Sequence, residues 1–260
     1  MKKLLLLLII APMIGLSQIA VLVVGPQEGG TQNAIYKMEK IGDYLKDQGV
    51  LVKTFYGEKA DWDRIKRASN GASFFIYCGH GGNLGDNGTA GGLFLTSNVS
   101  SRDIVNGLKL KKNAVVIFKS VCNGAGSSAS DNGDIGLNEA LRRVSDYSHP
   151  FIDIGVSCYY ANNVGDGCLG FIEDFFAGKT VKECFINSTQ SWLTQTTTYS
   201  NGVKSVEKVL SSDPFAYIEI EKSYKYMRKM KISIASIDWG SKNYDITYVA
   251  DPDFTINKLK

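Results

Sequence analysis

Between residues 19 and 193, apolar runs alternate with segments of helical periodicity, and this alternation constrains the fold more than any other feature. The apolar runs are largely continuous, as strands covered on both faces should be, and predict five strands at 19–25, 50–57, 73–78, 114–121 and 151–158. The segments between and after them predict helices at 33–49, 61–69, 101–110, 137–147 and 169–193. Regular alternation with short links predicts an α/β fold, a three-layer α/β/α sandwich around a mostly parallel sheet.

The last sixty residues have a different pattern. KISIASIDWG (231–240) and YDITYVADPDFTIN (244–257) predict two strands, as an antiparallel edge or a small appended module, and the lysine-rich stretch 221–231 predicts a solvated helical face. We therefore expect a main domain at 19–199 and a C-terminal β-containing extension at 200–260, packed on the same domain. A chain of 260 residues can bury a sizeable core of this kind.

The N-terminal stretch MKKLLLLLIIAPMIGLSQ (1–18) has two lysines, a short leucine-rich run and small residues before Gln18. This pattern predicts a signal peptide cleaved near Ser17 or Gln18, because the apolar run is short for a membrane span. We expect a secreted, periplasmic or cell-surface protein with no stable membrane insertion after signal removal. The net charge of +3 includes no basic block that would suggest a nucleic-acid partner.

Two reactive residue types follow neighbouring predicted strands. His80 comes after FFIYC in FFIYCGHGG (74–82), and Cys122 comes after VVIFK in VVIFKSVCNG (115–124). Ligands bind beyond the carboxyl ends of parallel strands, and neighbouring strands lie about 4.8 Å apart. We expect the imidazole and the thiol to share a cleft rimmed by the loops that follow them. His149 precedes the predicted strand 151–158, so it should lie at the opposite end of the sheet.

These residue types suit acyl transfer. A thiolate at Cys122 would attack a carbonyl carbon, and the His80 imidazole would activate it and protonate the leaving amine. The intermediate needs N–H donors aimed at its oxyanion. Gly81 can approach closely because it has no side chain, and the amide of Cys122 is the natural second donor. A cysteine at a strand end is otherwise usually a small buried hydrophobe.

An apolar strand with His-Gly, followed by an apolar strand with a cysteine, resembles the caspase-like (clan CD) cysteine peptidases. That group includes caspases, legumain, separase, clostripain, gingipains and CHAT-domain proteins, and the pattern here is nearest to the last three. Their histidine precedes their cysteine, whereas papain-like enzymes have the reverse order. The resemblance covers roughly residues 19–190 and departs from the usual motif at Val121, where Ala or Ser is usual.

The resemblance implies a caspase-like peptidase domain with Cys122 as nucleophile, His80 as general acid/base, and the amides of Gly81 and Cys122 as oxyanion hole. The implied function is an exported cysteine endopeptidase acting on protein or peptide substrates and requiring no cofactor. A catalytically inactive binding or regulatory module with the same fold is the alternative. A flavodoxin-like domain would need a phosphate-cradling loop after the first strand, and residues 25–32 match no such motif.

In caspase-like enzymes, loops at the carboxyl end of the sheet form the pocket for the residue before the scissile bond. The corresponding candidates here are Glu28, Ser120, Tyr159 and Asp166. An acid at the pocket base would select Arg or Lys, as in clostripain-like and gingipain-like enzymes. Each acid is also readily explained as a solvated loop carboxylate, and Tyr159 would equally well pack beneath the pocket.

The remaining cysteines and acidic residues suggest three further sites. Cys78 is predicted to be core, and a disulfide between Cys158 and Cys168 would close a loop, with Cys184 nearby. A zinc site is less well supported because this cluster has no CxxC spacing and no histidine close by. The loop SDNGD (130–134) is compatible with calcium, although it lacks an EF-hand pattern.

Overall fold

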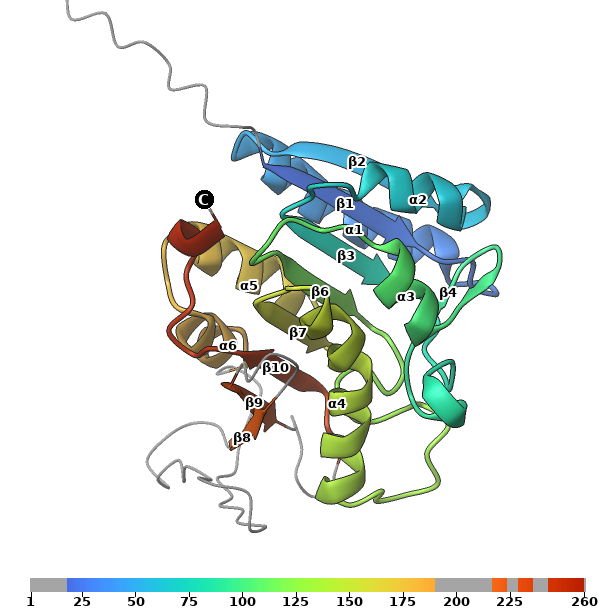
Figure 1. The fold of residues 1–260 in the computed structure, drawn as a ribbon, viewed down its shortest axis with the longest axis vertical. Coiled ribbons are helices and arrows are strands. Elements are labelled where there is room, and N and C mark those ends of the chain that lie inside the picture. Colours follow the sequence, from blue (N-terminus) through green and yellow to red (C-terminus); the bar gives the residue numbers. More distant parts are fainter. Residues whose placement is uncertain (1–17, 190–216, 224–228, 236–242, 260) are drawn as a thin grey trace, which may run out of the picture.

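Five parallel strands form one part of an eight-stranded sheet in the computed structural model, which describes residues 18–189, 217–223, 229–235 and 243–259. Their spatial order is β2-β1-β3-β6-β7 (Figure 1). They are β1 (Ile19–Val24), β2 (Leu51–Tyr56), β3 (Phe74–Cys78), β6 (Val115–Lys119) and β7 (Cys158–Asn162). Four of the five predicted strands are thereby confirmed. Almost all of the predicted signal peptide (1–18) lies outside the described residues.

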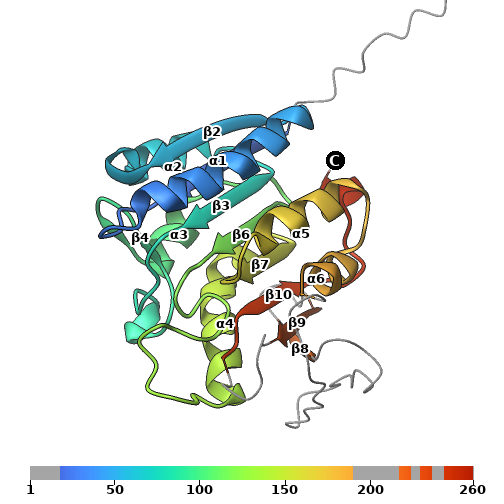
Figure 2. The same cartoon turned by 180° about the vertical axis from the view of Figure 1, so that it is seen from behind.

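Helices cover both faces of this sheet (Figures 1 and 2). One face packs against α1 (Thr31–Asp47), α5 (Gly167–Phe176) and α6 (Val181–Thr189). The other packs against α2 (Trp62–Ala68), α3 (Ser101–Gly107) and α4 (Leu137–Asp153). The predicted three-layer α/β/α sandwich is therefore confirmed. No helix in the described part of the chain combines the length and hydropathy needed to cross a bilayer.

The C-terminal extension continues the central sheet. Strand β10 (Ile246–Ala250) pairs antiparallel with β7, β9 (Lys229–Ala235) with β10, and β8 (Tyr217–Ser223) with β9. Six of the eight strands therefore run in one direction, and the expected antiparallel edge is found. The helix expected at 221–231 is wrong, because most of that stretch belongs to β8 and β9. Ile232 and Ala235 of β9 are buried in the clusters on opposite faces of the sheet, which favours strand over solvated helix.

The other corrections concern the segments around β7. The strand expected at 151–158 is wrong: helix α4 continues to Asp153, and β7 begins only at Cys158. Phe151 continues the buried face of α4 one turn beyond Tyr147, and Gly155 turns the chain with a φ of +99°. The helical region expected at 169–193 is split into α5 and α6 at Gly178, where φ is +91°.

Candidate active site

The loops that carry His80 and Cys122 lie against each other. Strands β3 and β6 are direct neighbours, with Cys78 opposite Lys119 in the register. At Gly81 a Cβ atom would collide with the backbone carbonyl of Cys122 and would approach the Tyr147 hydroxyl to 2.8 Å. Only glycine fits this contact, which brings the His80–Gly81 peptide beside Cys122. His80 is exposed and Cys122 is half-buried.

Cys122 sits on a sharp turn that ends β6. Ser120 and Asn123 both adopt left-handed backbone conformations, with φ values of +53° and +66°. Such conformations cost roughly 1–3 kcal/mol each for residues other than glycine and cluster at functional sites. The buried side chain of Val121 anchors the turn, and Gly124 N–H donates to the Val121 carbonyl at 3.0 Å. The chain thus holds Cys122 at the end of the strand at a conformational cost.

Arg143 of α4 holds the loop after Cys122 in place through hydrogen bonds. Its Nη1 donates to Asn123 Oδ1 at 2.9 Å, to the Gly126 carbonyl at 3.2 Å and to both Asp131 carboxylate oxygens at 2.9 Å. The Arg143 and Asp131 side chains are only 16% and 13% exposed, so this ion pair is largely shielded from water. Arg143 therefore ties the residue after the thiol to a rigid helix.

This ion pair bears on the expected calcium loop at 130–134. Both oxygens of Asp131 accept from Arg143, and one also accepts the Ser128 N–H at 2.7 Å. Asp134 accepts the Gly136 N–H at 2.8 Å. Among the residues that the structure describes, no three His, Cys, Asp or Glu side chains gather as a metal site would require. Calcium binding stays a prediction.

The loop after β3 is held through its backbone by two buried tyrosines. The Tyr77 hydroxyl lies 2.9 Å from the His80 carbonyl and accepts the Phe94 N–H at 3.1 Å. The Tyr147 hydroxyl accepts the Gly82 N–H at 2.7 Å. Burial raises the pKa of both tyrosines, so these hydroxyls stay protonated across the physiological range. The backbone of His80 is fixed while its imidazole faces solvent.

The amides of Gly81 and Cys122 are available to a ligand. Neither N–H donates a hydrogen bond to another residue in the described ranges. Backbone N–H groups away from bulk water are nearly always paired, and both residues are only partly exposed. Two unpaired donors beside a half-buried thiol match the needs of a tetrahedral oxyanion.

Two depressions flank the contact between these loops. One, of about 300 Å³, is lined by Ser120, Cys122, Asn163, Asp245 and neighbouring residues. The other, of about 590 Å³, includes His80 and Glu28 in its lining. The predicted pocket candidates are thus divided, with Ser120 on the thiol side and Glu28 on the imidazole side.

The other two pocket candidates line neither depression. Tyr159 is fully buried, and its hydroxyl donates to the Gly124 carbonyl at 2.8 Å. It packs beneath the loop that follows Cys122, so the alternative that it walls the pocket is wrong. Asp166 precedes α5, and its exposed carboxylate lies 3.8 Å from Lys40 Nζ on α1.

All five cysteines are free thiols, so the disulfide expected between Cys158 and Cys168 is wrong. Strand β7 runs from Cys158 to Asn162, about 13 Å at about 3.3 Å per residue, and Cys168 Sγ lies 3.8 Å from the Asn162 carbonyl at the far end of the strand. Cys168 Sγ lies 3.7 Å from the Phe118 carbonyl, and burial raises its pKa to about 12. Cys78 is buried, as predicted for a core residue. Cys122 differs from the other four, which are buried.

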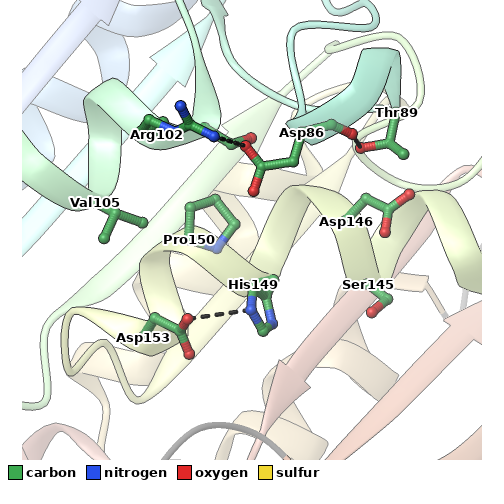
Figure 3. A pocket seen from close by; sticks show the side chains of 10 residues that line it. Asp86, Thr89, Arg102, Val105, Ser145, Asp146, His149, Pro150 and Asp153 are labelled. Carbon is green, nitrogen blue, oxygen red and sulfur yellow. Dashed lines mark hydrogen bonds and ion pairs between the residues drawn. The ribbon is translucent and has the colours of Figure 1, made fainter.

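A third pocket, of about 480 Å³, lies between α3 and α4 (Figure 3). Its lining includes Asp86, Arg102 and His149, and His149 Nε2 lies 3.1 Å from Asp153 Oδ2. The expectation that His149 immediately precedes a strand is wrong, because it belongs to the last turns of α4. Since neither His80 nor Cys122 lines this pocket, the pocket is separate from the contact between their loops.

Sequence reasoning missed Asn163 and Asp245, which line the pocket beside Cys122. Asp245 directly precedes β10, which runs antiparallel to β7. A strand that runs antiparallel to β7 begins beside the residue where β7 ends, so the first residues of β10 lie at the edge of the sheet where the parallel strands end. Recognising the direction of this strand would have pointed to Asp245.

A scan of the chain against models of known protein families found no match, and a search of curated proteins found none either.

Proposed function

We propose that this protein is an exported cysteine endopeptidase in which Cys122 is the nucleophile and His80 the general acid/base. The observation that carries the proposal is the contact of Gly81 with the Cys122 carbonyl. That contact brings an imidazole-bearing loop, a half-buried thiol and two unpaired amides to one edge of the sheet. The left-handed turn at Ser120 and Asn123 supports it, because strained conformations of this kind persist where function needs them.

The proposed reaction follows from these positions. His80 accepts the thiol proton, and the Cys122 sulfur attacks the peptide carbonyl carbon to form a tetrahedral intermediate. The amide N–H groups of Gly81 and Cys122 donate to the oxyanion. As the C–N bond breaks, the His80 imidazolium gives its proton to the leaving amine. A water molecule, deprotonated by His80, then hydrolyses the thioester and restores the thiol.

A second candidate is a non-catalytic module that binds a peptide in the same place. It is favoured by one observation: His80 and Cys122 line separate depressions, and His80 is exposed. If the imidazole does not reach the thiol, no proton passes between them and no peptide bond is cleaved. The fixed loop at Cys122 and the two unpaired amides would still bind a peptide carbonyl.

Covalent labelling separates these candidates. The reduced mature chain, with and without calcium, is treated with peptidyl acyloxymethyl ketones of mixed sequence, and the modified residue is identified by mass spectrometry. We expect modification at Cys122, none in Cys122→Ala, and slower labelling in His80→Ala. Cys78→Ala is the matched control and should label normally, because Cys78 is buried. No labelling, together with no cleavage of a peptide library, would favour the binding module.

A further inference from the structure

The pocket between α3 and α4 lies outside the proposed active site, and its volume of about 480 Å³ suits a small organic ligand or a single side chain. Its walls come from three segments: α3, α4 and the loop that follows His80 (Figure 3). The lining combines an apolar surface, formed by Val105 and Pro150, with a group of ionisable side chains. These ionisable side chains are Asp86, Arg102, Asp146, His149 and Asp153.

Two of the three carboxylates in this lining have an arginine beside them. Asp86 Oδ1 lies 3.9 Å from Arg102 Nη2, and Asp146 Oδ2 lies 2.6 Å from Arg142 Nη1. The third carboxylate, that of Asp153, faces an imidazole instead (Figure 3). Asp153 is therefore the carboxylate whose negative charge is balanced least by the side chains around the pocket.

Only one oxygen of this carboxylate has a partner. His149 Nε2 lies 3.1 Å from Asp153 Oδ2, and a neutral imidazole donates one hydrogen bond without adding positive charge. Asp153 Oδ1 is buried and accepts no hydrogen bond from the residues that the structure describes. Because the Asp153 side chain is only 14% exposed, water compensates its charge poorly. A ligand that brings both a positive charge and an N–H donor would therefore bind favourably beside it.

Ser101 gives an independent indication that a polar ligand belongs in this pocket. Ser101 lines the pocket at the start of α3 and is only 8% exposed. Its Oγ is buried and has no hydrogen-bond partner in the described ranges. Buried hydroxyl groups nearly always have a partner, and the missing one can come from an occupant of the pocket. Unpartnered polar atoms thus lie on α3 as well as on α4.

We propose that the pocket between α3 and α4 binds a primary alkylammonium group, which pairs with the Asp153 carboxylate. Because His149 occupies one oxygen of that carboxylate, both prongs of a guanidinium cannot be accepted, whereas a compact ammonium needs a single oxygen. Val105 and Pro150 offer an apolar surface to the methylene groups behind the charge. Free diamines and the lysine side chains of a protein partner share this chemistry. The proposal does not depend on the proposed peptidase function.

The test is NMR of the reduced mature chain with isotope-labelled histidine. The sequence has two histidines, so the signal that disappears in His149→Gln assigns both, and His80, which does not line this pocket, is the internal reference. Cadaverine, its uncharged diol analogue, and the blocked amino acids acetyl-lysine methylamide and acetyl-arginine methylamide are titrated at one pH. We expect a saturable shift of the His149 signal with the two amines. Binding of the diol and of the arginine derivative should be at least about tenfold weaker.

Three variants locate the binding site. Asp153→Asn should weaken cadaverine binding by at least about tenfold, because it removes the charge that pairs with the ammonium. Asp146→Asn is the matched control in the same pocket and helix, and it should weaken binding by less than about threefold because its carboxylate is already bound to Arg142. Val105→Trp should block the pocket. Val105 is 38% exposed, so this variant tests the site even if Asp153→Asn fails to fold, and thermal unfolding of each variant is measured alongside.

Each outcome bears on the proposal. Saturable binding of an amine that is lost in Asp153→Asn and in Val105→Trp would support the site. Binding of the lysine derivative would identify a lysine side chain as a suitable occupant, whereas binding of cadaverine alone would identify a free diamine. The proposal would be overturned by the absence of a saturable shift with either amine, by equal binding of the diol or the arginine derivative, by equal weakening in Asp146→Asn, or by unchanged binding in both Asp153→Asn and Val105→Trp. None of these results affects the peptidase proposal, since no cleavage is measured.

Discussion

The two loops that meet at Gly81 are held in different ways. The loop after Cys122 is fixed by side-chain contacts: Arg143 binds Asn123 and the shielded Asp131. The loop after β3 is held near His80 through its backbone, by the Tyr77 and Tyr147 hydroxyls, and the His80 imidazole is exposed. The proposed nucleophile, Cys122, is thus preorganised by the fold, whereas the proposed acid/base, His80, has freedom to align when a substrate fills the depression beside it.

The largest effect is expected from a substitution at the contact between the two loops. Gly81→Ala places a Cβ against the Cys122 carbonyl, which belongs to the rigid loop, so the His80 loop must move instead. We expect kcat/KM to fall by about 100-fold or more, because the Gly81 amide leaves the oxyanion site. Peptide cleavage measures the fall in kcat/KM, and thermal unfolding measures any change in stability.

The matched control is Gly170→Ala in α5. A Cβ there meets no atom within 4 Å, and alanine is the better helix former by about 1 kcal/mol. This variant should keep full activity and gain slight stability. Equal activity of Gly81→Ala and the wild type would mean that the two loops separate during turnover.

The next largest effect is expected at Arg143. Arg143→Met leaves Asp131 without its partner in a largely buried position, and we expect a loss of about 3 kcal/mol in the free energy of unfolding. The neighbouring Arg142 is 48% exposed and binds Glu139 and Asp146 on the surface. Arg142→Met should therefore cost less than about 1 kcal/mol. Urea denaturation of both variants measures these two losses in the free energy of unfolding.

Arg143→Met also tests whether the loop positions the thiol. We expect the variant to label more slowly at Cys122 at a temperature where it is fully folded, and Arg143→Lys to recover part of the rate. If Arg143→Met is less stable but labels at the wild-type rate, Arg143 serves stability alone.

The sequence predicted the sheet and the contact of the two loops that carry His80 and Cys122 through one physical regularity, but the single cleft expected for the imidazole and the thiol is wrong, because the two residues line separate depressions. Strands covered on both faces are continuous apolar runs, and parallel strands of this kind present their following loops at one edge. The strand predicted at 151–158 is wrong for a related reason. Phe151 and Ile152 are buried residues of α4, and a short apolar run fits a buried helix as well as a strand. Pro150 lies inside α4, although proline usually disrupts the interior of a helix.

The pocket could not be predicted because it depends on tertiary placement. Asp166 and Asp245 both lie beside chain turns, yet Asp166 faces Lys40 whereas Asp245 lines the cavity beside Cys122. Only the antiparallel pairing of β10 with β7 distinguishes them. Local sequence carries little information about such pairing, because it is decided by which edge of the finished sheet remains open.

A smaller effect is expected where the His80 loop meets α4. Tyr147→Phe leaves the Gly82 N–H without its acceptor, so we expect a loss of about 1–2 kcal/mol in the free energy of unfolding. Peptide cleavage should also fall, but less than in Gly81→Ala. Tyr159→Phe removes a bond to Gly124 and should impair cleavage less, because Arg143 still holds that loop. Equal loss of activity in Tyr147→Phe and Tyr159→Phe would contradict the conclusion that the two loops are held in different ways.

The smallest effect concerns the pH dependence of the free energy of unfolding, through the carboxylate of Glu139. Hydrogen bonding to Arg142, and then to Arg143, lowers the pKa of Glu139 from 4.5 to about 2. A carboxylate with a lowered pKa in the folded state stabilises the protein above pH 4.5, and this contribution is lost as the pH falls towards 2. Since Glu139 is 33% exposed, solvent screening limits the contribution to about 1 kcal/mol.

Urea denaturation at pH 6 and pH 3 measures this contribution in the wild type and in Glu139→Gln. The wild type should exceed Glu139→Gln in free energy of unfolding, and this advantage should be larger at pH 6 than at pH 3. Arg142→Met should reduce the change in the advantage with pH, because Arg142 is the main cause of the lowered pKa of Glu139. Glu139 also accepts from Arg143 Nε at 2.9 Å, so protonation loosens one of the contacts that hold Arg143 in place. An advantage that is equal at both pH values would mean that the ionised form of Glu139 does not add to stability through Arg142 and Arg143.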